Sequence, residues 1–164
     1  MSVFTTCYHS PIGKIKISGT ENFISHILFI NDDSPPVEIS QSIPPLLIEC
    51  TEQLIQYFQG ARRTFDLPLN QQGTAFQQEV WTELMSIAFG KTVSYIHIAR
   101  RTGDPKATRA VANANCKNNL CIIVPCHRVI GVNNELTGYS GGLWRKKWLL
   151  EHEKKITYGI QTLF

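Results

Sequence analysis

Apolar and polar positions alternate through the first thirty residues, which is the two-residue period of a β-strand. Residues 14–18 put Ile15 and Ile17 on one face, and residues 23–30 form a second apolar stretch. The turn sequence Ser10-Pro11-Ile12-Gly13 comes directly before them. This pattern predicts an antiparallel meander of strands at the start of the chain.

The next part of the chain changes to the period of a helix. Residues 31–45 contain two Pro-Pro pairs and are predicted to form a loop. In residues 46–59, apolar side chains recur every three or four positions up to Gly60, which predicts an amphipathic helix. Residues 64–67 are predicted as one more short strand, and the polar residues 68–73 as a linker. We therefore expect a small α/β domain over residues 1–73.

Helical spacing continues beyond the linker, so we expect a second domain over residues 74–164. Apolar residues at positions 76, 80, 84 and 87 predict a helix that ends at Gly90. Ser94 is a candidate N-cap for a short helix through Arg101. A last helix begins near position 144. It is predicted to bury three side chains and to expose three cations: Trp144, Trp148 and Leu149 inward, and Arg145, Lys146 and Lys147 outward.

Between these helices, a glycine turn precedes a helix with two distinct faces. Asp104 and Pro105 suit the cap and the first position of that helix. Small or apolar residues share one stripe: Ala107, Ala110, Val111 and Ala114. Polar residues share another: Lys106, Arg109 and Asn113. A helix, a glycine turn and a helix of this kind are typical of a helix-turn-helix, although many such pairs do not bind DNA.

Composition narrows the setting of the protein. The chain has 164 residues, 43% of them hydrophobic and 18% charged, as in ordinary globular proteins. No apolar run approaches the roughly 20 residues that span a bilayer, so we expect no membrane association. The N-terminus lacks the basic start and apolar core of a secretory signal. Five cysteines, an odd number, fit a reducing compartment, and we expect the cytoplasm.

Charge is divided unevenly along the chain. Residues 1–73 carry four Lys and Arg against seven Asp and Glu, whereas the remaining residues carry twelve against six. A basic C-terminal part favours an anionic partner, of which nucleic acid is the leading candidate. A mildly basic, solvated face explains the same numbers, and charge by itself does not separate the two.

A thiol and an imidazole stand side by side in Val124-Pro125-Cys126-His127-Arg128-Val129-Ile130. Cysteine is a nucleophile only as its thiolate, and a neighbouring histidine is one way to reach that state near neutral pH. The fixed φ of Pro125 stiffens the backbone that presents the sulfur. The alternative is a buried cysteine at the end of a strand with a surface histidine after it.

Three cysteines precede or form this motif, at positions 116, 121 and 126. Their even spacing, with four residues between neighbours, does not reproduce the ligand pattern of a common zinc site. We therefore predict no metal there, and we interpret Cys116 and Cys121 as small buried hydrophobic residues.

Six short motifs follow one another in order along the second part of the chain. They are Phe76-x-x-x-Val80-Trp81, Gly90-x-x-x-Ser94-Tyr95-x-x-Ile98-Ala99, Pro105-x-Ala107-x-Arg109-Ala110-Val111, Ile123-Val124-Pro125-Cys126-His127-Arg128-Val129-Ile130, Thr137-Gly138-Tyr139-Ser140-Gly141-Gly142 and Lys147-x-Leu149-Leu150-x-x-Glu153. This order closely resembles the stand-alone O6-alkylguanine-DNA alkyltransferases, also called methylated-DNA–protein-cysteine methyltransferases. The resemblance implies an α/β (α+β) fold: a small ribonuclease-H-like N-terminal domain and a mainly helical, winged-helix C-terminal domain with a helix-turn-helix.

The resemblance implies a role for each reacting residue. Cys126 matches the acceptor, whose thiolate attacks the alkyl carbon on guanine O6 and keeps the alkyl group. His127 matches the base that deprotonates the thiol through a water, and Glu153 the carboxylate that orients the imidazole. Tyr95 matches a proton donor to guanine N3. Asn118 matches a residue that ties the helix-turn-helix to the active-site segment.

Substrate-binding residues are implied in the same way. Tyr139 and Ser140 match a loop that closes over the base, with the Ser140 N–H meeting O6. The carbonyls of Cys126 and Val129 match the groups that read the guanine amino group, and Pro125 belongs to the same segment.

The implied DNA-binding residues follow from where O6 lies. Because O6 is inside the stack of a duplex, the nucleotide must be flipped out, and Arg109 matches the residue that fills the gap. In this family the helix lies in the minor groove, where the small Ala107 and Ala110 permit close approach. Three polar residues complete the expected set: Lys106, Asn113 and Arg128.

The resemblance further implies a monomer that acts once, without a cofactor, on double-stranded DNA containing O6-alkylguanine or O4-alkylthymine. Some relatives hold a zinc ion in the N-terminal domain, but Cys7 and His9 lack the second cysteine expected near Thr20, so we predict no zinc. A second departure is Asn118-Asn119, where the family usually has Asn-Pro and hence a more rigid connection.

Two other functions remain open at this point. A non-catalytic binder of alkylated DNA would need the helix-turn-helix but not Cys126. A thiol hydrolase would use Cys126, His127 and Glu153 but would not need the helix-turn-helix.

Overall fold

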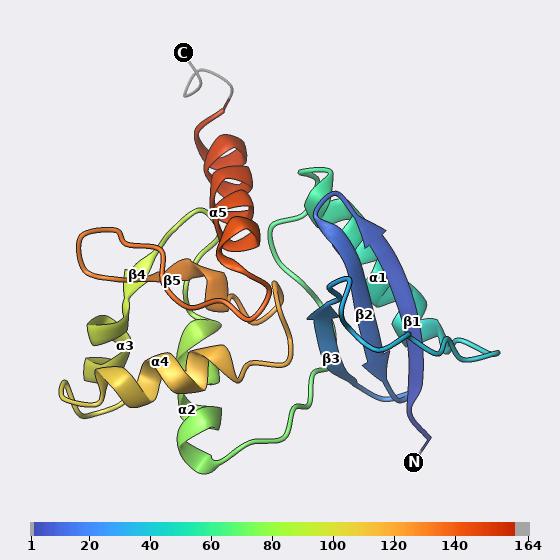
Figure 1. The fold of residues 1–164 in the computed structure, drawn as a ribbon, viewed down its shortest axis with the longest axis horizontal. Helices are drawn as coiled ribbons and strands as arrows, with labels where there is room; N and C mark the ends of the chain where they lie inside the picture. The colour runs from blue at the N-terminus through green and yellow to red at the C-terminus, as the bar shows by residue number, and fades with distance from the viewer. Residues whose placement is uncertain (1, 160–164) are drawn as a thin grey trace. The chain divides into compact units, whose positions relative to one another are not determined.

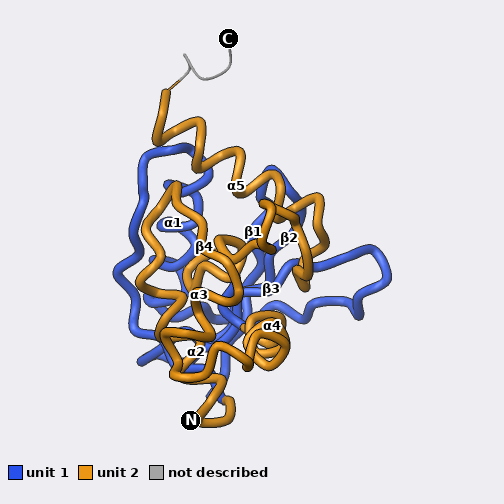
Figure 2. Tube along the Cα trace, turned by 90° about the vertical axis from the view of Figure 1, so that its left-hand side faces the viewer, with its two compact units in different colours: residues 1–72, 119–121 blue, residues 73–118, 122–164 orange. Residues whose placement is uncertain are grey.

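The computed structural model describes residues 2–159, and it separates into two compact units (Figure 2). The first unit comprises residues 1–72 together with 119–121, and the second comprises residues 73–118 and 122–164. Each unit has its own elements and its own core. No helix in the described part of the chain is both long and apolar enough to cross a membrane.

The first unit is a three-stranded antiparallel sheet with one helix (Figure 1). The strands β1 (Phe4–Ser10), β2 (Gly13–Gly19) and β3 (Ile24–Phe29) follow one another in sheet order, which confirms the predicted meander. The helix α1 (Pro45–Phe58) packs on the sheet and buries its apolar stripe. The core collects the inward-facing side chains of both: Ile15, Ile17, Ile24, Ile27, Leu47, Leu54 and Tyr57.

The predicted strand over residues 64–67 is wrong. Those residues have no strand pairing, and the chain instead makes a single bridge a little later, between Leu69 and Ile24. The backbone hydrogen bonds Ile24 N–H to Pro68 O and Asn70 N–H to Ile24 O surround that bridge. The apolar and polar alternation at 64–67 therefore marked the approach to the sheet edge, not a strand.

A distant segment completes the first unit. Leu120 forms a parallel bridge with Ile27 at the β3 edge. Ile27 N–H donates to Asn119 O, and Cys121 N–H donates to Ile27 O. The Gln71 side-chain oxygen accepts from Asn119 N–H. The chain thus returns to the first unit for three residues, a feature that a division at residue 73 does not include.

The second unit is mostly helical. Its elements are α2 (Ala75–Leu84), β4 (Val93–Ser94), α3 (Tyr95–Arg101), α4 (Thr108–Cys116), the 3-10 helix η1 (Cys126–Arg128), β5 (Val129–Ile130) and α5 (Leu143–Tyr158). Thr74 and Gln77 form a reciprocal capping box at the start of α2. Ser94 caps α3 by accepting from His97 N–H, as its sequence position predicts. The short strands β4 and β5 pair in parallel.

Four local predictions differ from the structure. The helix α4 begins at Thr108, because residues 105–107 form a turn in which Asp104 accepts from Lys106 N–H. Cys116, interpreted as a buried residue, is exposed. The alternative in which Cys126 ends a strand is also wrong, because the apolar run before it is a turn with Ile122 at φ 73. At the start of α5, the buried and exposed sides are the reverse of the prediction: Trp144 is 58% exposed, whereas Arg145 and Lys146 are buried.

Candidate functional site

Cys126 lies at the start of η1, within the second unit, and is 2% exposed. Asn118 donates from its side chain to Val124 O at 2.9 Å, and Asn115 donates to Cys126 O at 3.2 Å. Cys126 N–H also donates to Val124 O, which closes a tight turn before the sulfur. Two buried amides at the end of α4 therefore fix the backbone that carries the thiol.

His127, which follows Cys126 in the sequence, forms a buried pair with Glu153. His127 Nε2 is 2.7 Å from Glu153 Oε2, and the two side chains are 0% and 1% exposed. Glu153 reaches this position from α5, and His127 from η1. Among the described residues, His127 Nδ1 has no hydrogen-bond partner. The ring nitrogen that is not held by Glu153 is thus available to accept a proton.

Arg128 belongs to the same cluster and not to the protein surface. Its Nε donates to Glu153 Oε1 at 2.8 Å and its Nη2 to Glu153 Oε2 at 3.1 Å. Its Nη1 donates to Ile87 O at 2.7 Å, and the side chain lies near the Phe89 ring. Because Arg128 is 6% exposed, the structure corrects its expected role from a DNA contact to a partner of Glu153.

Gly90 provides a further donor to this carboxylate. Gly90 N–H donates to Glu153 Oε1 at 3.2 Å. The residue has φ +79, and a Cβ placed on it would collide with the Thr157 hydroxyl. Only glycine therefore fits at this position, both for its backbone conformation and for the space that it leaves.

The charges of the pair follow from these contacts. Burial by itself raises the pKa of Glu153, but His127 and Arg128 outweigh it and hold that pKa well below its usual range. Burial lowers the pKa of His127, and Glu153 only partly opposes it. Glu153 is thus an anion and His127 a neutral base at neutral pH, with Nε2–H donated to the carboxylate.

Tyr95 and Lys146 form a second polar group near Cys126. The Tyr95 hydroxyl donates to Thr137 O at 3.0 Å, and Lys146 Nζ lies 3.4 Å from that hydroxyl. Burial raises the pKa of Tyr95, so its phenol keeps its proton. Burial lowers the pKa of Lys146 to about 8, and this shift is opposed by Cys126 and Cys116.

The expected substrate-binding residues lie in two segments of the second unit. Pro125 and Val129 are buried on either side of η1, and Val129 pairs with Val93. Tyr139 is 9% exposed and Ser140 is exposed, in the loop that leads to α5. Gly142 N–H donates to Tyr139 O and so closes a turn around Ser140.

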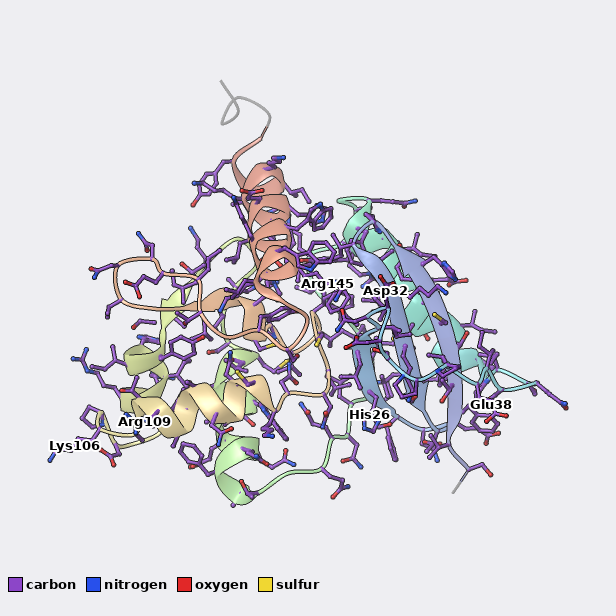
Figure 3. The ribbon with its side chains drawn as sticks, in the orientation of Figure 1. His26, Asp32, Glu38, Lys106, Arg109 and Arg145 are labelled. Carbon is purple, nitrogen blue, oxygen red and sulfur yellow. The ribbon has the colours of Figure 1, made fainter. Side chains whose placement is uncertain are left out.

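Most of the expected DNA-binding residues lie on one exposed face. Lys106 and Arg109 extend from the first turn of α4 and the turn before it (Figure 3). Ala110 and Asn113 are exposed on the same helix, and Ala107 is half-buried. A shallow hollow on this face extends from α4 to Tyr95 and Thr137, and it is lined by Tyr95, Lys106, Thr108, Arg109, Ala112 and Thr137.

Several contacts were not predictable from the residue pattern. The motif marks Arg128 as part of the site but does not show that it points inward to Glu153. No spacing signal marks Asn115, Arg145 or Lys146, because helical periodicity does not distinguish them from other polar residues of a helix. No group of three or more His, Cys, Asp and Glu residues in the described part of the chain is placed to hold a metal ion.

Comparison with known families and proteins gives one consistent result. Residues 75–155 match the family described as "6-O-methylguanine DNA methyltransferase, DNA binding domain". Residues 3–71 match "6-O-methylguanine DNA methyltransferase, ribonuclease-like domain". The constitutive methylated-DNA–protein-cysteine methyltransferase of Bacillus subtilis is 42% identical over 165 residues, which cover 96% of this chain and 98% of that protein.

Solved structures agree with these matches. The O6-methylguanine methyltransferase of Mycobacterium tuberculosis has a TM-score of 0.85 and 40% identity, with 99% of each chain covered. Mycobacterium tuberculosis OGT in complex with DNA has a TM-score of 0.83 and 41% identity, with 92% of each chain covered. An O6-methylguanine DNA methyltransferase from Methanococcus jannaschii has a TM-score of 0.68 and 26% identity, and covers 91% of this chain and 93% of its own.

Proposed function

This chain belongs to the 6-O-methylguanine DNA methyltransferase family and repairs DNA by direct reversal, and we propose that Cys126 is the residue that accepts the alkyl group. DNA is its partner. The observation that carries the assignment of Cys126 is the buried His127–Glu153 pair beside it, in the same unit as the helix-turn-helix.

The proposed reaction is a direct displacement. His127 takes the thiol proton, and the Cys126 thiolate attacks the alkyl carbon on guanine O6. The new carbon–sulfur bond forms as the carbon–oxygen bond breaks, and the electron pair of that bond stays on the guanine. Glu153 supports this step by holding His127 Nε2–H, which leaves the other ring nitrogen for the proton.

The departing guanine needs a proton so that it does not leave as an anion. Tyr95 is the proposed donor, because its raised pKa keeps the phenol protonated and it lies on the wall of the hollow that leads from α4. Cys126 has no route back to a free thiol in this scheme, since no step breaks the new carbon–sulfur bond by expelling the thiolate. One protein molecule therefore repairs one base.

The proposed substrate is O6-alkylguanine in double-stranded DNA, with O4-alkylthymine as a further one. Arg109 enters the gap left by the flipped nucleotide, while Lys106 and Asn113 contact the backbone beside it. The small side chains of Ala107 and Ala110 let α4 approach the groove. The protein acts as a monomer in the cytoplasm.

The pocket for the base is proposed to be formed by Pro125, Val129, Tyr139 and Ser140. Asn118 supports it by donating a hydrogen bond to Val124 O. The carbonyls of Cys126 and Val129 read the guanine amino group, and the Ser140 N–H meets O6. Because Asn118 donates to Val124 O and Asn115 to Cys126 O, this pocket is rigid despite Asn119 standing where a proline is usual.

Intact-protein mass spectrometry tests the assignment. After mixing with a duplex that contains O6-methylguanine, the protein should gain the mass of one CH2, mapped to Cys126, and stop at one equivalent. Cys126→Ser should abolish the gain but keep DNA binding, whereas Cys121→Ser, also at a buried cysteine, should keep both.

Two results would contradict the proposal. Tight binding of the duplex with no mass change would favour a non-catalytic binder of alkylated DNA. Multiple turnovers on an ester or an amide, without lasting modification of Cys126, would favour a thiol hydrolase.

A further inference from the structure

The helix α5 begins with two consecutive buried cations. Arg145 is 4% and Lys146 is 0% exposed, although their neighbours Trp144 and Lys147 are both exposed. Burying a cation is costly unless hydrogen-bond partners replace the water that it loses. The hydrogen-bond acceptors of these two side chains therefore indicate their role.

Arg145 holds the end of the substrate loop. Its Nη1 donates to Gly141 O at 2.9 Å within a buried contact. The exposed Trp144 ring covers the guanidinium, with Cζ 4.6 Å from the ring centroid. Figure 3 shows Arg145 close to the N-terminal end of α5, where that loop arrives.

Lys146 holds the beginning of the same loop. Its Nζ donates to Thr137 O at 2.7 Å and lies 3.4 Å from the Tyr95 hydroxyl. Thr137 O also accepts from that hydroxyl at 3.0 Å. The two cations thus bind two carbonyls that lie four residues apart, at Thr137 and Gly141.

Only three residues stand between these two carbonyls: Gly138, Tyr139 and Ser140. Gly138 turns the chain at φ 51, and Gly142 N–H donates back to Tyr139 O. The segment is otherwise exposed, except for the Tyr139 side chain. The two cations therefore bind the backbone at both ends of this short segment.

We propose that Arg145 and Lys146 act together as a loop clamp, which holds Tyr139 and Ser140 in place for the base before the DNA arrives. Both are positioning residues, since they act through the loop. A loop that is ordered only on binding loses conformational entropy at that moment, and a clamp removes this cost from the reaction. The inference rests on the proposed function, in which the loop closes over the alkylated base.

The experiment compares Arg145→Met and Lys146→Met with Lys147→Met, which removes the exposed cation next to them. Single-turnover transfer from O6-methylguanine in a duplex separates the rate at saturating DNA from the affinity. Arg145→Met and Lys146→Met should each lower the saturating rate about tenfold or more, while the Kd for unmodified duplex stays within about twofold of the control. Amide hydrogen exchange at residues 138–142 should accelerate in both.

Arg145→Lys keeps a donor for Gly141 O and should recover part of the rate. Trp144→Ala uncovers the guanidinium without removing it and provides a second test if Arg145→Met does not fold. The clamp is overturned if Arg145→Met changes neither the transfer rate nor the amide exchange of the loop. If Arg145→Met does not fold, the same result in Trp144→Ala overturns it. Active Lys147→Met protein would at the same time uphold the proposed function. If the wild-type protein itself transfers no alkyl group, the proposed function is contradicted instead.

Discussion

At the scale of single residues, Glu153 decides the chemistry of its surroundings. It accepts hydrogen bonds from His127, from Arg128 and from Gly90 N–H, so both carboxylate oxygens are satisfied in a buried position. Such a carboxylate stays ionised, and it fixes both the orientation and the tautomer of the imidazole. The same residue thereby links α5, η1 and the turn after α2.

The lowered pKa of His127 has a consequence for the pH dependence of repair. Because burial favours the neutral imidazole, His127 remains a base at pH values where an ordinary histidine, with a pKa of about 6.5, is already protonated. The single-turnover rate at saturating duplex should therefore show no loss assignable to His127 as the pH falls to 6.5, and should decline only below it. A titration of His127 by NMR with a midpoint above 6.5 would contradict this expectation.

Two arginine–glutamate pairs give a matched test of burial. Arg128 pairs with Glu153 in the interior, whereas Arg101 pairs with Glu83 at 3.2 Å with the arginine side chain 61% exposed. Arg128→Met leaves a buried carboxylate without its cation and should cost about 3–5 kcal/mol. Arg101→Met should cost about 0–1 kcal/mol. Urea denaturation measures both, and equal losses would show that the interior pair has no special role.

At the scale of elements, the helix pair α3 and α4 contributes an exposed polar face and a hydrogen-bonding support for the turn that carries Cys126. Its exposed face carries Lys106 and Arg109. Asn115 is buried near the end of α4, and the buried Asn118 follows just after the helix. One short helix thus faces the proposed DNA surface and also holds the thiol-bearing turn. Local order at the site therefore depends on α4 remaining intact to its last residue.

Arg109 should matter for extracting the base and not for the displacement itself. Arg109→Ala is expected to slow transfer from O6-methylguanine in a duplex about tenfold or more, since the flipped state loses the side chain that fills the gap. Transfer from free O6-benzylguanine should change less than about twofold, because a free base needs no flipping. Arg100→Ala, at an exposed position on α3, is the control. Equal losses on both substrates would remove the flipping role.

At the scale of the whole molecule, the two compact units do not correspond to two continuous stretches of the sequence. Asn119–Cys121 leaves the helical unit to extend the edge of β3, and the chain then returns to form the turn that carries Cys126. The first unit is consequently incomplete when only residues 1–72 are considered. Its edge strand gains backbone partners from a segment that precedes Cys126 by only a few residues.

Leu120→Ala should therefore weaken a strand that is distant in the sequence. Leu120 is 1% exposed, and its truncation should cost about 2–5 kcal/mol. Amide exchange in β3 should accelerate, because Ile27 loses a packed partner beside its two backbone hydrogen bonds. Leu136→Ala, in the loop before α5 and only half-buried, is the control. If faster exchange stays confined to residues 119–123, the segment does not stabilise the sheet.

The sequence by itself determined most of the helices and strands of this protein and its candidate acceptor, because both depend on local signals. Period-two alternation predicts the strands, apolar spacing with Ser94 and Gly60 predicts helices and their ends, and the ordered motifs identify Cys126 as the candidate acceptor. Only the tertiary structure decided which long side chains turn inward. Helical spacing assigns Arg145 and Lys146 to solvent and the resemblance assigns Arg128 to DNA, yet all three are buried. Their positions depend on carbonyls and a carboxylate brought together from distant segments, and such partners leave no periodic trace in the sequence.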